Sequence, residues 1–299
     1  MPWLKTSTLI LLFTALCAEA STLTRDMIIL TSIEFEGRPS GAPTPHRSAH
    51  YIYKQFEKEG LAVEIHSFQF KQGFFGTGTG HNVVATQSCN VAQCRPALVI
   101  TAHYDHLGRK GNKHYPGAND NATGVAVMMD IARQLKGAQL ERDIIYLATD
   151  AEERGLHGAK HFVSQLGEQS VFLNINLDML DIQKRNTLYA LASFDMKSKK
   201  GAIVRHFERY EVALSMFFSS KRMARRLNEP QIDWLRASDH YPFYRAKIPF
   251  IYFGSGVDDN HHTIDDSLAE INFEKLTLVS KSMTGLVRSL TAASDVVTN

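Results

Sequence analysis

The stretch Ala97-Leu98-Val99-Ile100-Thr101-Ala102-His103-Tyr104-Asp105 decides the fold of this 299-residue chain. Residues 97–101 form a nearly continuous apolar run, which is typical of a strand buried on both faces of a sheet. His103 and Asp105 follow this run directly. Sites in α/β proteins form just past the carboxyl ends of such strands, so we expect chemistry at this edge of the sheet.

Two later segments repeat the arrangement of an apolar strand followed by acidic residues. Residues 143–148 lead to Glu152-Glu153, and residues 172–177 lead to Asp178. The other expected elements are helices at residues 47–59, 124–135, 156–166, 201–210 and 273–290, and strands at residues 63–70, 82–85, 187–192, 214–218 and 250–253. Apolar strands that alternate with helices predict an α/β fold with a mostly parallel central sheet and helices on both faces.

The overall composition is that of a globular protein, with 44% hydrophobic and 21% charged residues. Lysine and arginine number 33 against 31 acidic residues, which gives a formal net charge of +2. No block of like charges interrupts the chain. The charge pattern therefore indicates neither nucleic acid nor an anionic membrane as a partner.

The first twenty residues have the three parts of a secretory signal peptide. Lys5 supplies a positive charge, residues 9–16 are mostly apolar, and Ala18-Glu19-Ala20 forms a cleavage site. The apolar run is shorter than the ~20 residues that a membrane-spanning helix needs, and no later stretch is apolar enough to span. We therefore expect residues 1–20 to be cleaved, residues 21–299 to form a single domain, and the protein to be periplasmic or secreted.

Removal of the leader would leave two cysteines, Cys89 and Cys94. Exported proteins meet an oxidising environment, so this closely spaced pair is expected to form a disulfide. The alternative is half of a zinc site, which would need a second pair of soft ligands that the chain lacks.

Five groups of metal-binding residue types fall at the expected edge of the sheet. Besides those after the three strands already described, Asp120 lies in the turn-rich stretch 116–124, and His262 follows the strand at residues 250–253. Each residue alone has an ordinary explanation as a turn or helix-cap residue. Together, two histidines and several carboxylates suit zinc or a similar cation. They exceed what one four-coordinate metal can use, which favours two metals that share a bridging carboxylate.

Six short motifs follow one another along the chain: His103-x-Asp105, Gly117-Ala118-Asn119-Asp120-Asn121-Ala122-x-Gly124, Glu152-Glu153, Asn176-Leu177-Asp178-Met179, Ser238-Asp239-His240-x-Pro242-Phe243 and His262-Thr263-x-x-Asp266. In these motifs and their order the chain resembles the M28 metallopeptidases, from about residue 31 to residue 290. That family includes secreted bacterial leucyl aminopeptidases with two zinc ions. The resemblance implies a zinc-exopeptidase fold, which is a three-layer α/β sandwich with a mixed, mainly parallel central sheet.

By position, the resemblance implies a complete set of ligands for two zinc ions per chain. Asp120 would bridge the two ions. His103 and Asp178 would complete one ligand set, and Glu153 and His262 would complete the other.

The resemblance also implies catalytic roles. Glu152 would act as the general base, and Asp105 would accept the second ring N–H of His103 and fix its tautomer. Neighbouring side chains of an extended segment point apart, so Glu153 can bind metal while Glu152 faces the reacting water. The peptide bond after Asp120 would be cis, as it is in the resembled peptidases.

Other polar residues receive separate interpretations. Asp239 is expected near the substrate end of the site, with a structural role as the alternative. His261 is discounted in favour of His262, and Asp266 is expected to cap a turn or to orient His262. The basic stretch 221–226 is interpreted as a solvated face, and alternatively as an anchor for an acidic substrate. Five histidines match no ligand position and are expected on the surface or on helices: His106, His114, His157, His161 and His206.

The resulting prediction is an exported dizinc aminopeptidase that acts as a monomer on peptides with a free N-terminus. Leu, Phe or Met are the expected first residues, because ligand pockets are mostly apolar. A glutaminyl cyclase of the same fold, with one zinc ion, is the first alternative, although residues 119–124 are closer to the dinuclear peptidases. A carboxypeptidase or dipeptidase is another. A metal-free receptor domain is the third, and it would not be expected to keep all five ligand positions.

Overall fold

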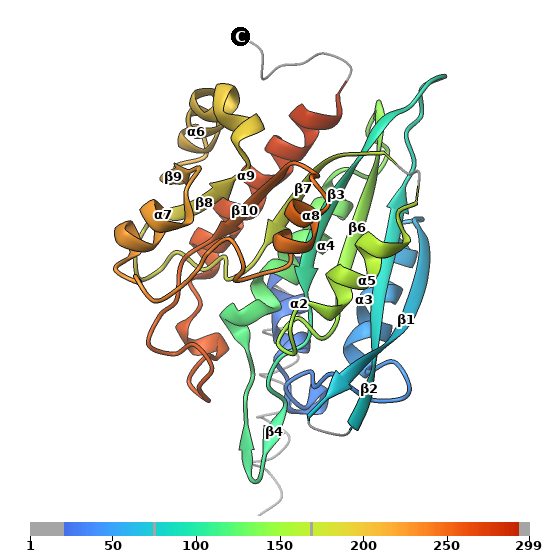
Figure 1. Cartoon of the computed structure of the whole chain (residues 1–299), viewed down its shortest axis with the longest axis vertical. Coiled ribbons are helices and arrows are strands. Elements are labelled where there is room, and N and C mark those ends of the chain that lie inside the picture. Colours follow the sequence, from blue (N-terminus) through green and yellow to red (C-terminus); the bar gives the residue numbers. More distant parts are fainter. Residues whose placement is uncertain (1–20, 74–75, 168–169, 293–299) are drawn as a thin grey trace, which may run out of the picture.

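The computed structural model describes residues 21–73, 76–167 and 170–292, so the predicted signal peptide lies outside the described residues. Its centre is an eight-stranded sheet with the order β1-β2-β6-β3-β7-β10-β8-β9 (Figure 1). The strands of this sheet are β1 (Ala62–Gln72), β2 (Gly76–Gln87), β3 (Arg95–His103), β6 (Arg142–Thr149), β7 (Val171–Leu177), β8 (Leu188–Ala192), β9 (Leu214–Phe217) and β10 (Phe250–Gly254). A separate hairpin consists of β4 (Arg109–Lys110) and β5 (Lys113–His114).

The four central strands β6, β3, β7 and β10 run parallel to one another. Antiparallel pairings of β2 with β6 and of β8 with β10 flank this group. At the two edges, β1 pairs antiparallel with β2, and β9 pairs parallel with β8. The predicted α/β class with a mixed, mainly parallel sheet is therefore confirmed.

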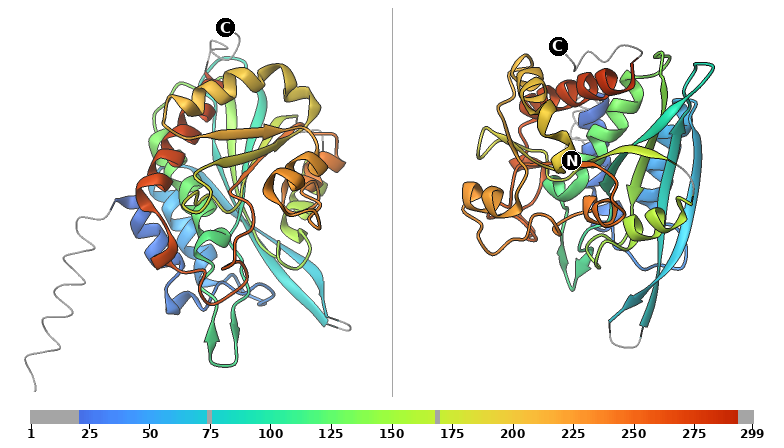
Figure 2. Two further views of the ribbon diagram at one scale, coloured as in Figure 1. Left: turned by 90° about the vertical axis from the view of Figure 1, so that its left-hand side faces the viewer. Right: turned by 45° about the horizontal axis from the view of Figure 1, so that its top comes forward.

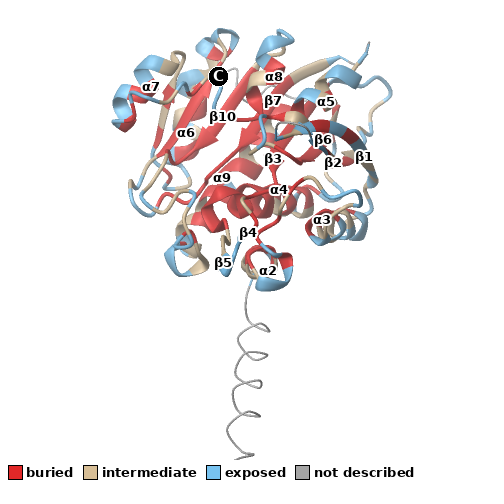
Figure 3. Ribbon diagram, turned by 60° about the horizontal axis from the view of Figure 1, so that its bottom comes forward, coloured by how far each residue is buried: buried red, intermediate tan, exposed pale blue. Residues whose placement is uncertain are grey.

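Helices cover both faces of the sheet and complete a three-layer sandwich (Figures 2 and 3). One layer consists of α2 (Thr22–Leu30), α3 (Arg47–Lys58), α4 (Thr123–Gln134), α6 (Lys200–Glu208) and α9 (Phe273–Thr291). The opposite layer consists of α5 (His157–Gln165), α7 (Ser220–Leu227) and α8 (His240–Arg245). Short 3-10 turns occur at Ile33–Phe35, Phe194–Lys199 and Leu268–Glu270, and a wider turn at Ala118–Ala122 precedes α4.

The main hydrophobic core lies between the sheet and the helices α2, α3, α4, α6 and α9. Helix α3 shows why these segments form helices, because Ile52 and Phe56, four positions apart, are buried on one face. The His46 ring accepts the Ser48 N–H and so caps the first turn. Each fully buried Leu, Ile or Phe contributes roughly 1.5–3 kcal/mol to folding. The packed layers therefore hold the strand ends in fixed positions.

The parallel register brings the ends of the four central strands to one edge. His103 at the end of β3 is level with Thr149 at the end of β6, and Phe253 in β10 is level with Leu177 at the end of β7. Residues that directly follow these strands must therefore lie beside one another, which is the placement that the sequence predicts.

Several elements were not predicted from the sequence. Helix α7 carries mostly basic residues and lacks a long apolar run, and α8 and the β4–β5 hairpin are short. The predicted Cys89–Cys94 disulfide is present. Among the helices of residues 21–292 that the structure describes, none has the length and apolar character needed to cross a membrane.

Candidate active site

The predicted site residues meet at the carboxyl edge of the parallel strands. His103 is the last residue of β3, and Asp178 follows β7 directly. Asp120 lies in the turn before α4, Glu153 follows β6, and His262 lies in the loop after β10. All five border one hollow of about 370 Å³. The fold thus brings together five side chains from five different segments, up to 159 positions apart in the sequence.

The first group of donor atoms belongs to His103, Asp120 and Asp178. The Nε2 atom of His103 lies 3.4 Å from Asp120 Oδ1 and 3.3 Å from Asp178 Oδ1. A neutral histidine has at most one proton on this nitrogen, and that proton cannot point at two carboxylates at once. A cation held between the three atoms accounts for the arrangement better than a hydrogen bond does.

The second group lies on the other side of Asp120. The Nε2 atom of His262 is 3.2 Å from Asp120 Oδ2 and 3.1 Å from Glu153 Oε2. The two carboxylate oxygens of Asp120 therefore face two different groups of donors. A carboxylate in this position can bridge two metal ions.

The spacing and chemistry of both groups fit zinc. Zinc–ligand bonds of about 2.0–2.2 Å in a tetrahedron separate neighbouring ligand atoms by roughly 3.3–3.6 Å. The separations in the two groups run from 3.1 to 3.4 Å. Imidazole nitrogen and carboxylate oxygen are both established zinc ligands. The residues present therefore suit this metal.

His106 belongs to the site, and its predicted placement on the surface or a helix is wrong. Its side chain is buried, with Nδ1 3.0 Å from Glu153 Oε1 and 3.7 Å from Asp120 Oδ2. The cause is local, because the His106 N–H donates to the Arg38 carbonyl and turns the chain inward after β3. In the sequence, the feature that could have placed His106 in the site is its position three residues after His103. The other four histidines that were set aside lie outside the cluster of donor atoms.

His261 also approaches the Asp120 carboxylate, although the sequence pattern selected only His262. Its ring stacks on His262 with a centroid distance of 3.8 Å. Its Nε2 atom lies 3.3 Å from Asp120 Oδ2. Three histidine rings, those of His106, His261 and His262, therefore lie beside Asp120 and Glu153, where the sequence predicted only His262.

Asp105 has a different partner from the one that the resemblance implied. The second ring nitrogen of His103, Nδ1, donates to the backbone carbonyl of Asp105 at 3.1 Å, and the Asp105 carboxylate is 3.8 Å away. The carboxylate instead accepts the backbone N–H groups of Glu152 and Glu153, at 3.0 and 3.3 Å. Asp105 therefore fixes the turn that carries the two glutamates, and the tautomer of His103 is set by a carbonyl.

The segment with Glu152 and Glu153 is a tight turn, so the predicted extended conformation is wrong. Ala151 and Leu156, with φ of 57° and 61°, bound this turn. The positive φ angles reverse the chain directly after β6 and let the Asp105 carboxylate receive both N–H groups. The turn still separates the side chains, because Glu153 contacts His262 while Glu152 borders the hollow.

The pKa values of the two glutamates are shifted in opposite directions. Burial raises the pKa of Glu152 well above its usual range, and the charges of Asp239 and Asp178 add to this shift. Burial also opposes ionisation of Glu153, but hydrogen bonds from His106 and His262 outweigh it and lower its pKa to about 2. Paired acids with separated pKa values typically divide acid–base and ligand roles between them.

The Asp266 carboxylate holds the backbone at Asn119 and Asp120, whereas the sequence predicted a cap of the following turn or a partner of His262. Its Oδ1 atom accepts the Asn119 N–H at 2.7 Å, and Oδ2 accepts the Asp120 N–H at 3.0 Å. The next peptide bond, Asp120–Asn121, is cis, which confirms the prediction.

Arg38 was not predicted as a site residue. It is completely buried and donates to five backbone carbonyls, four of them at 2.6 to 2.9 Å and that of Asp120 at 3.4 Å. Burial lowers the pKa of Arg38 to about 10, against the opposing effect of the Asp266 and Asp120 carboxylates. Arg38 therefore stays charged at neutral pH and ties together the loops on which the donor residues lie. The four nearest carbonyls belong to Leu30, Tyr104, Pro116 and Gly117.

Asp239 is buried and does not line the hollow, and its carboxylate accepts a hydrogen bond from the Thr149 hydroxyl. Burial raises the pKa of Asp239 to about 6. The charge of Asp239 also contributes to the raised pKa of Glu152.

One side of the hollow is apolar. Met179, Trp234 and Tyr252 are buried side chains of this wall, and Ile232 and Val257 are partly exposed at its edge. An apolar wall beside a group of charged donors is a typical arrangement for a small-molecule site with a few orienting polar groups.

A sequence profile of Peptidase family M28 matches residues 82–287, a range that includes all the donor residues described above. The chain belongs to Peptidase family M28, a family of metallopeptidases.

Among individual relatives, the aminopeptidase YwaD of Bacillus subtilis is 29% identical over 226 residues, which are 71% of this chain and 45% of that protein. The chain spans about half the length of the curated relatives it matches. The solved structure of BSAP, a zinc aminopeptidase from Bacillus subtilis, superposes with a TM-score of 0.75 at 17% identity, over 92% of this chain and 95% of that one. A glutaminyl cyclase from Fimbriiglobus ruber gives a TM-score of 0.67 at 17% identity, over 89% and 94%. These likenesses confirm the predicted zinc-exopeptidase fold.

Proposed function

We propose that this chain is a dinuclear zinc aminopeptidase that removes the first residue of peptides. The observation that carries the proposal is the position of Asp120, whose two carboxylate oxygens face separate groups of donors. His103 and Asp178 would hold one zinc ion with it, and Glu153 and His262 would hold the other. Two ions per chain follow from two groups that share one carboxylate.

The chemistry divides between the metals and the protein. When bound, zinc supplies positive charge that polarises a peptide carbonyl and makes water more acidic. Glu152 takes the proton from the attacking water and passes it to the leaving amine. Its raised pKa suits the first step, because burial increases the affinity of the Glu152 carboxylate for the proton that it accepts.

The remaining residues hold Glu152 and the ligands in place. Asp105 fixes the turn that carries Glu152, and Asp266 fixes the backbone at Asp120. Preorganised groups need no rearrangement at the moment of reaction, which is where most of the rate advantage of such sites arises.

The hollow favours a substrate with an uncharged, apolar first residue and a free amine. The wall formed by Met179, Trp234 and Tyr252 can bury such a side chain. The carboxylates beside it favour an amine over an acylated nitrogen.

The test combines metal analysis with a small panel of substrates. Purified protein is expected to contain two equivalents of zinc and to hydrolyse Leu-amide, and chelation is expected to abolish this activity until zinc is returned. N-acetyl-Leu-amide is expected to remain intact. Full activity without metal would disprove the proposal. Conversion of a Gln-initiated dipeptide to a pyroglutamyl product, with its peptide bond intact, would favour a glutaminyl cyclase of the same fold.

We also infer that residues 1–20 are removed on export and that residues 21–299 act as a single-domain monomer. The support is the pattern of charge, apolar run and small residues at the start of the chain. Mass spectrometry of exported protein is expected to find Ser21 at the N-terminus, and light scattering is expected to give the mass of one chain.

A further inference from the structure

Helix α7 presents an unusually cationic surface. It carries Lys221, Arg222, Arg225 and Arg226, and it contains no acidic residue. Its other face is buried against the sheet, through Met223, Ala224 and Leu227. The four charged side chains are all exposed. The helix therefore serves as a fixed support for positive charge.

Two of these cations line a hollow of about 780 Å³ between α7 and the segment that follows it. Lys221 and Arg225 form no ion pair within the part of the chain that the structure describes. The one acidic residue of the hollow, Asp233, already accepts the Ser220 hydroxyl at 2.8 Å and lies 3.6 Å from Arg236 Nε. The hollow thus keeps two free positive charges.

This hollow adjoins the candidate active site. Ile232 lines both of them, and the residues just after it, Trp234 and Arg236, line the active-site hollow. Helices α7 and α8 lie on the same side of the sheet, and the segment that joins them carries these residues (Figure 3). A peptide that leaves the active site past Ile232 therefore reaches Lys221 and Arg225.

We propose that Lys221 and Arg225 form an extended subsite that binds acidic residues of the substrate, on the carboxyl side of the cleaved bond. The proposal rests on the aminopeptidase function and narrows it to peptides with Asp or Glu a few residues after the first. Arginine can hold a carboxylate through two parallel hydrogen bonds, and lysine adds a second positive charge. Solvent screens both contacts, so the subsite adjusts substrate preference without being required for cleavage.

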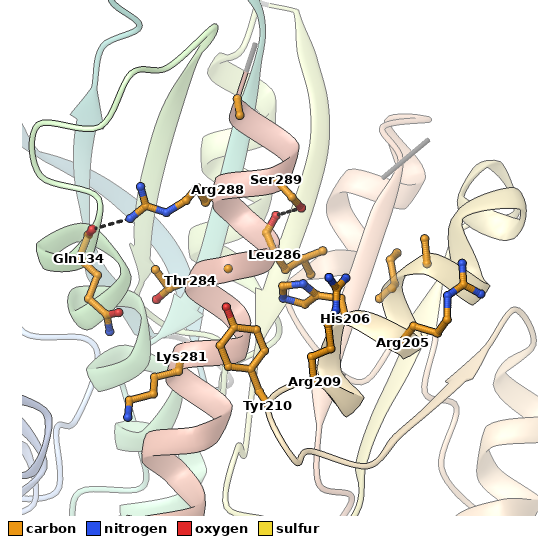
Figure 4. Close-up of a pocket in the computed structure, with 14 residues that line it drawn as sticks. Gln134, Arg205, His206, Arg209, Tyr210, Lys281, Thr284, Leu286, Arg288 and Ser289 are labelled. Carbon is orange, nitrogen blue, oxygen red and sulfur yellow. Dashed lines mark hydrogen bonds between the residues drawn. The ribbon is translucent and has the colours of Figure 1, made fainter. Parts of the chain in front are cut away.

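A second cationic groove provides a matched control. It lies between α6 and α9 and is lined by Arg205, Arg209, Lys281 and Arg288, with no acidic residue (Figure 4). It shares no lining residue with either of the other two hollows. In Figure 1 helix α6 and the C-terminal part of α9 lie toward the end of the molecule opposite to the β4–β5 hairpin, which follows the active-site end of β3. Reversal of two charges in this groove changes the net charge as much as reversal of Lys221 and Arg225 does. It leaves the residues of the proposed subsite unaltered.

The experiment measures hydrolysis of six-residue peptides that begin with Leu and carry Glu, Gln or Lys at position three, four or five. At low ionic strength, kcat/KM for the best Glu peptide is expected to exceed that for its Gln counterpart by about 3- to 10-fold, and the Lys peptide is expected to be poorest. The difference is expected in KM, because the contact is equally strong in the ground and transition states. The preference should decline between 0.05 and 0.5 M salt, concentrations chosen to span strong and weak screening.

The charge-reversed variant K221E/R225E is expected to lose or invert the preference for Glu peptides. The control variant R205E/R209E is expected to keep it, together with unchanged hydrolysis of Leu-amide. Equal kcat/KM for the Glu and Gln peptides in the unmodified protein, or equal loss of preference in both variants, would overturn the proposal. Leu-amide has no downstream residue, so its cleavage tests the aminopeptidase function independently of the subsite.

Discussion

Glu152 and Glu153 are chemically identical neighbours, and the protein makes them different through their contacts. Glu153 receives hydrogen bonds from two histidine rings, and these keep its carboxylate ionised as a ligand requires. Burial raises the pKa of Glu152, and the charges of neighbouring carboxylates raise it further. The backbone N–H groups of both residues are held by one carboxylate, that of Asp105. The difference between the pKa values of the two carboxylates therefore depends on the surroundings of their side chains.

Substitution of each glutamate by glutamine should separate these roles. Glu152→Gln is expected to keep two equivalents of zinc while kcat falls by ~10²–10⁴, because the proton acceptor is lost. Glu153→Gln is expected to retain less than two equivalents, since an ionised ligand is removed. Metal content by mass spectrometry and turnover of Leu-amide provide both measurements. Zinc loss in Glu152→Gln with intact binding in Glu153→Gln would reverse the assignment.

His106 is expected to strengthen zinc binding through Glu153. Its Nδ1 atom lies 3.0 Å from Glu153 Oε1, the oxygen that does not contact His262. Removal of a residue that orients a ligand typically costs ~10–100-fold in metal affinity. We therefore expect His106→Ala to weaken the second zinc ion by this factor in competition with a chelator. His50→Ala, at an exposed position of α3, is the control and should bind zinc normally. An unchanged affinity in His106→Ala would exclude this role.

At the scale of elements, the site is held by loops that the N-terminal segment ties together. Arg38 follows α2 and reaches the loop after β3 through the Tyr104 carbonyl, and the turn before α4 through Pro116 and Gly117. The Arg38 carbonyl in turn accepts the His106 N–H at 2.9 Å. A single buried side chain thus fixes two connections that carry donor residues.

Arg38→Met is expected to destabilise the protein strongly. The substitution would leave the carbonyls of Leu30, Tyr104 and Pro116 without the Arg38 donor, and each unsatisfied buried group costs about 1–3 kcal/mol. The Gly117 carbonyl keeps a hydrogen bond from the Ala122 N–H. Urea unfolding at pH 7 should show a loss on the order of 4 kcal/mol. Arg205→Met, at an exposed arginine of α6, should change stability by less than ~0.5 kcal/mol. A similarly small effect at Arg38 would refute its structural role.

Helices and strands with a strong apolar pattern were predicted from the sequence. Features that depend on individual hydrogen bonds to the backbone were not. The apolar strands β3, β6 and β7 and the helix α4 were predicted because their patterns reflect burial in the core. The hydrogen-bond partners of Asp105 and Asp266 were not predicted. The Asp105 carboxylate accepts a backbone N–H from 47 positions away, and the Asp266 carboxylate accepts one from 146 positions away. Backbone groups are the same in every residue, so no side-chain pattern reports them. His106 was missed because its burial depends on a hydrogen bond to the Arg38 carbonyl.

At the scale of the whole molecule, one buried histidine couples stability to pH. His240 begins α8 and is completely buried, with Nε2 donating to the Trp234 carbonyl at 3.0 Å. Its ring stacks against Phe250 and Tyr252, at centroid distances of 4.9 and 5.1 Å. Burial lowers the pKa of His240 to about 3, so the ring stays neutral in the folded protein far into the acid range. In the unfolded chain it would take up a proton near pH 6.5.

This difference predicts acid destabilisation with a definite sign. The stabilising effect of neutral His240 is complete above the unfolded pKa of ~6.5 and is lost as the pH falls toward the folded value, because only the unfolded chain binds the proton in that window. At pH 5 the loss amounts to about 2 kcal/mol. His240→Gln can still donate to the Trp234 carbonyl but does not titrate. Urea unfolding of both proteins at pH 7 and pH 5 should therefore show the stability gap between them shrinking by about 2 kcal/mol at the lower pH. A gap that is the same at both pH values would mean that His240 takes up its proton equally in the folded and unfolded states.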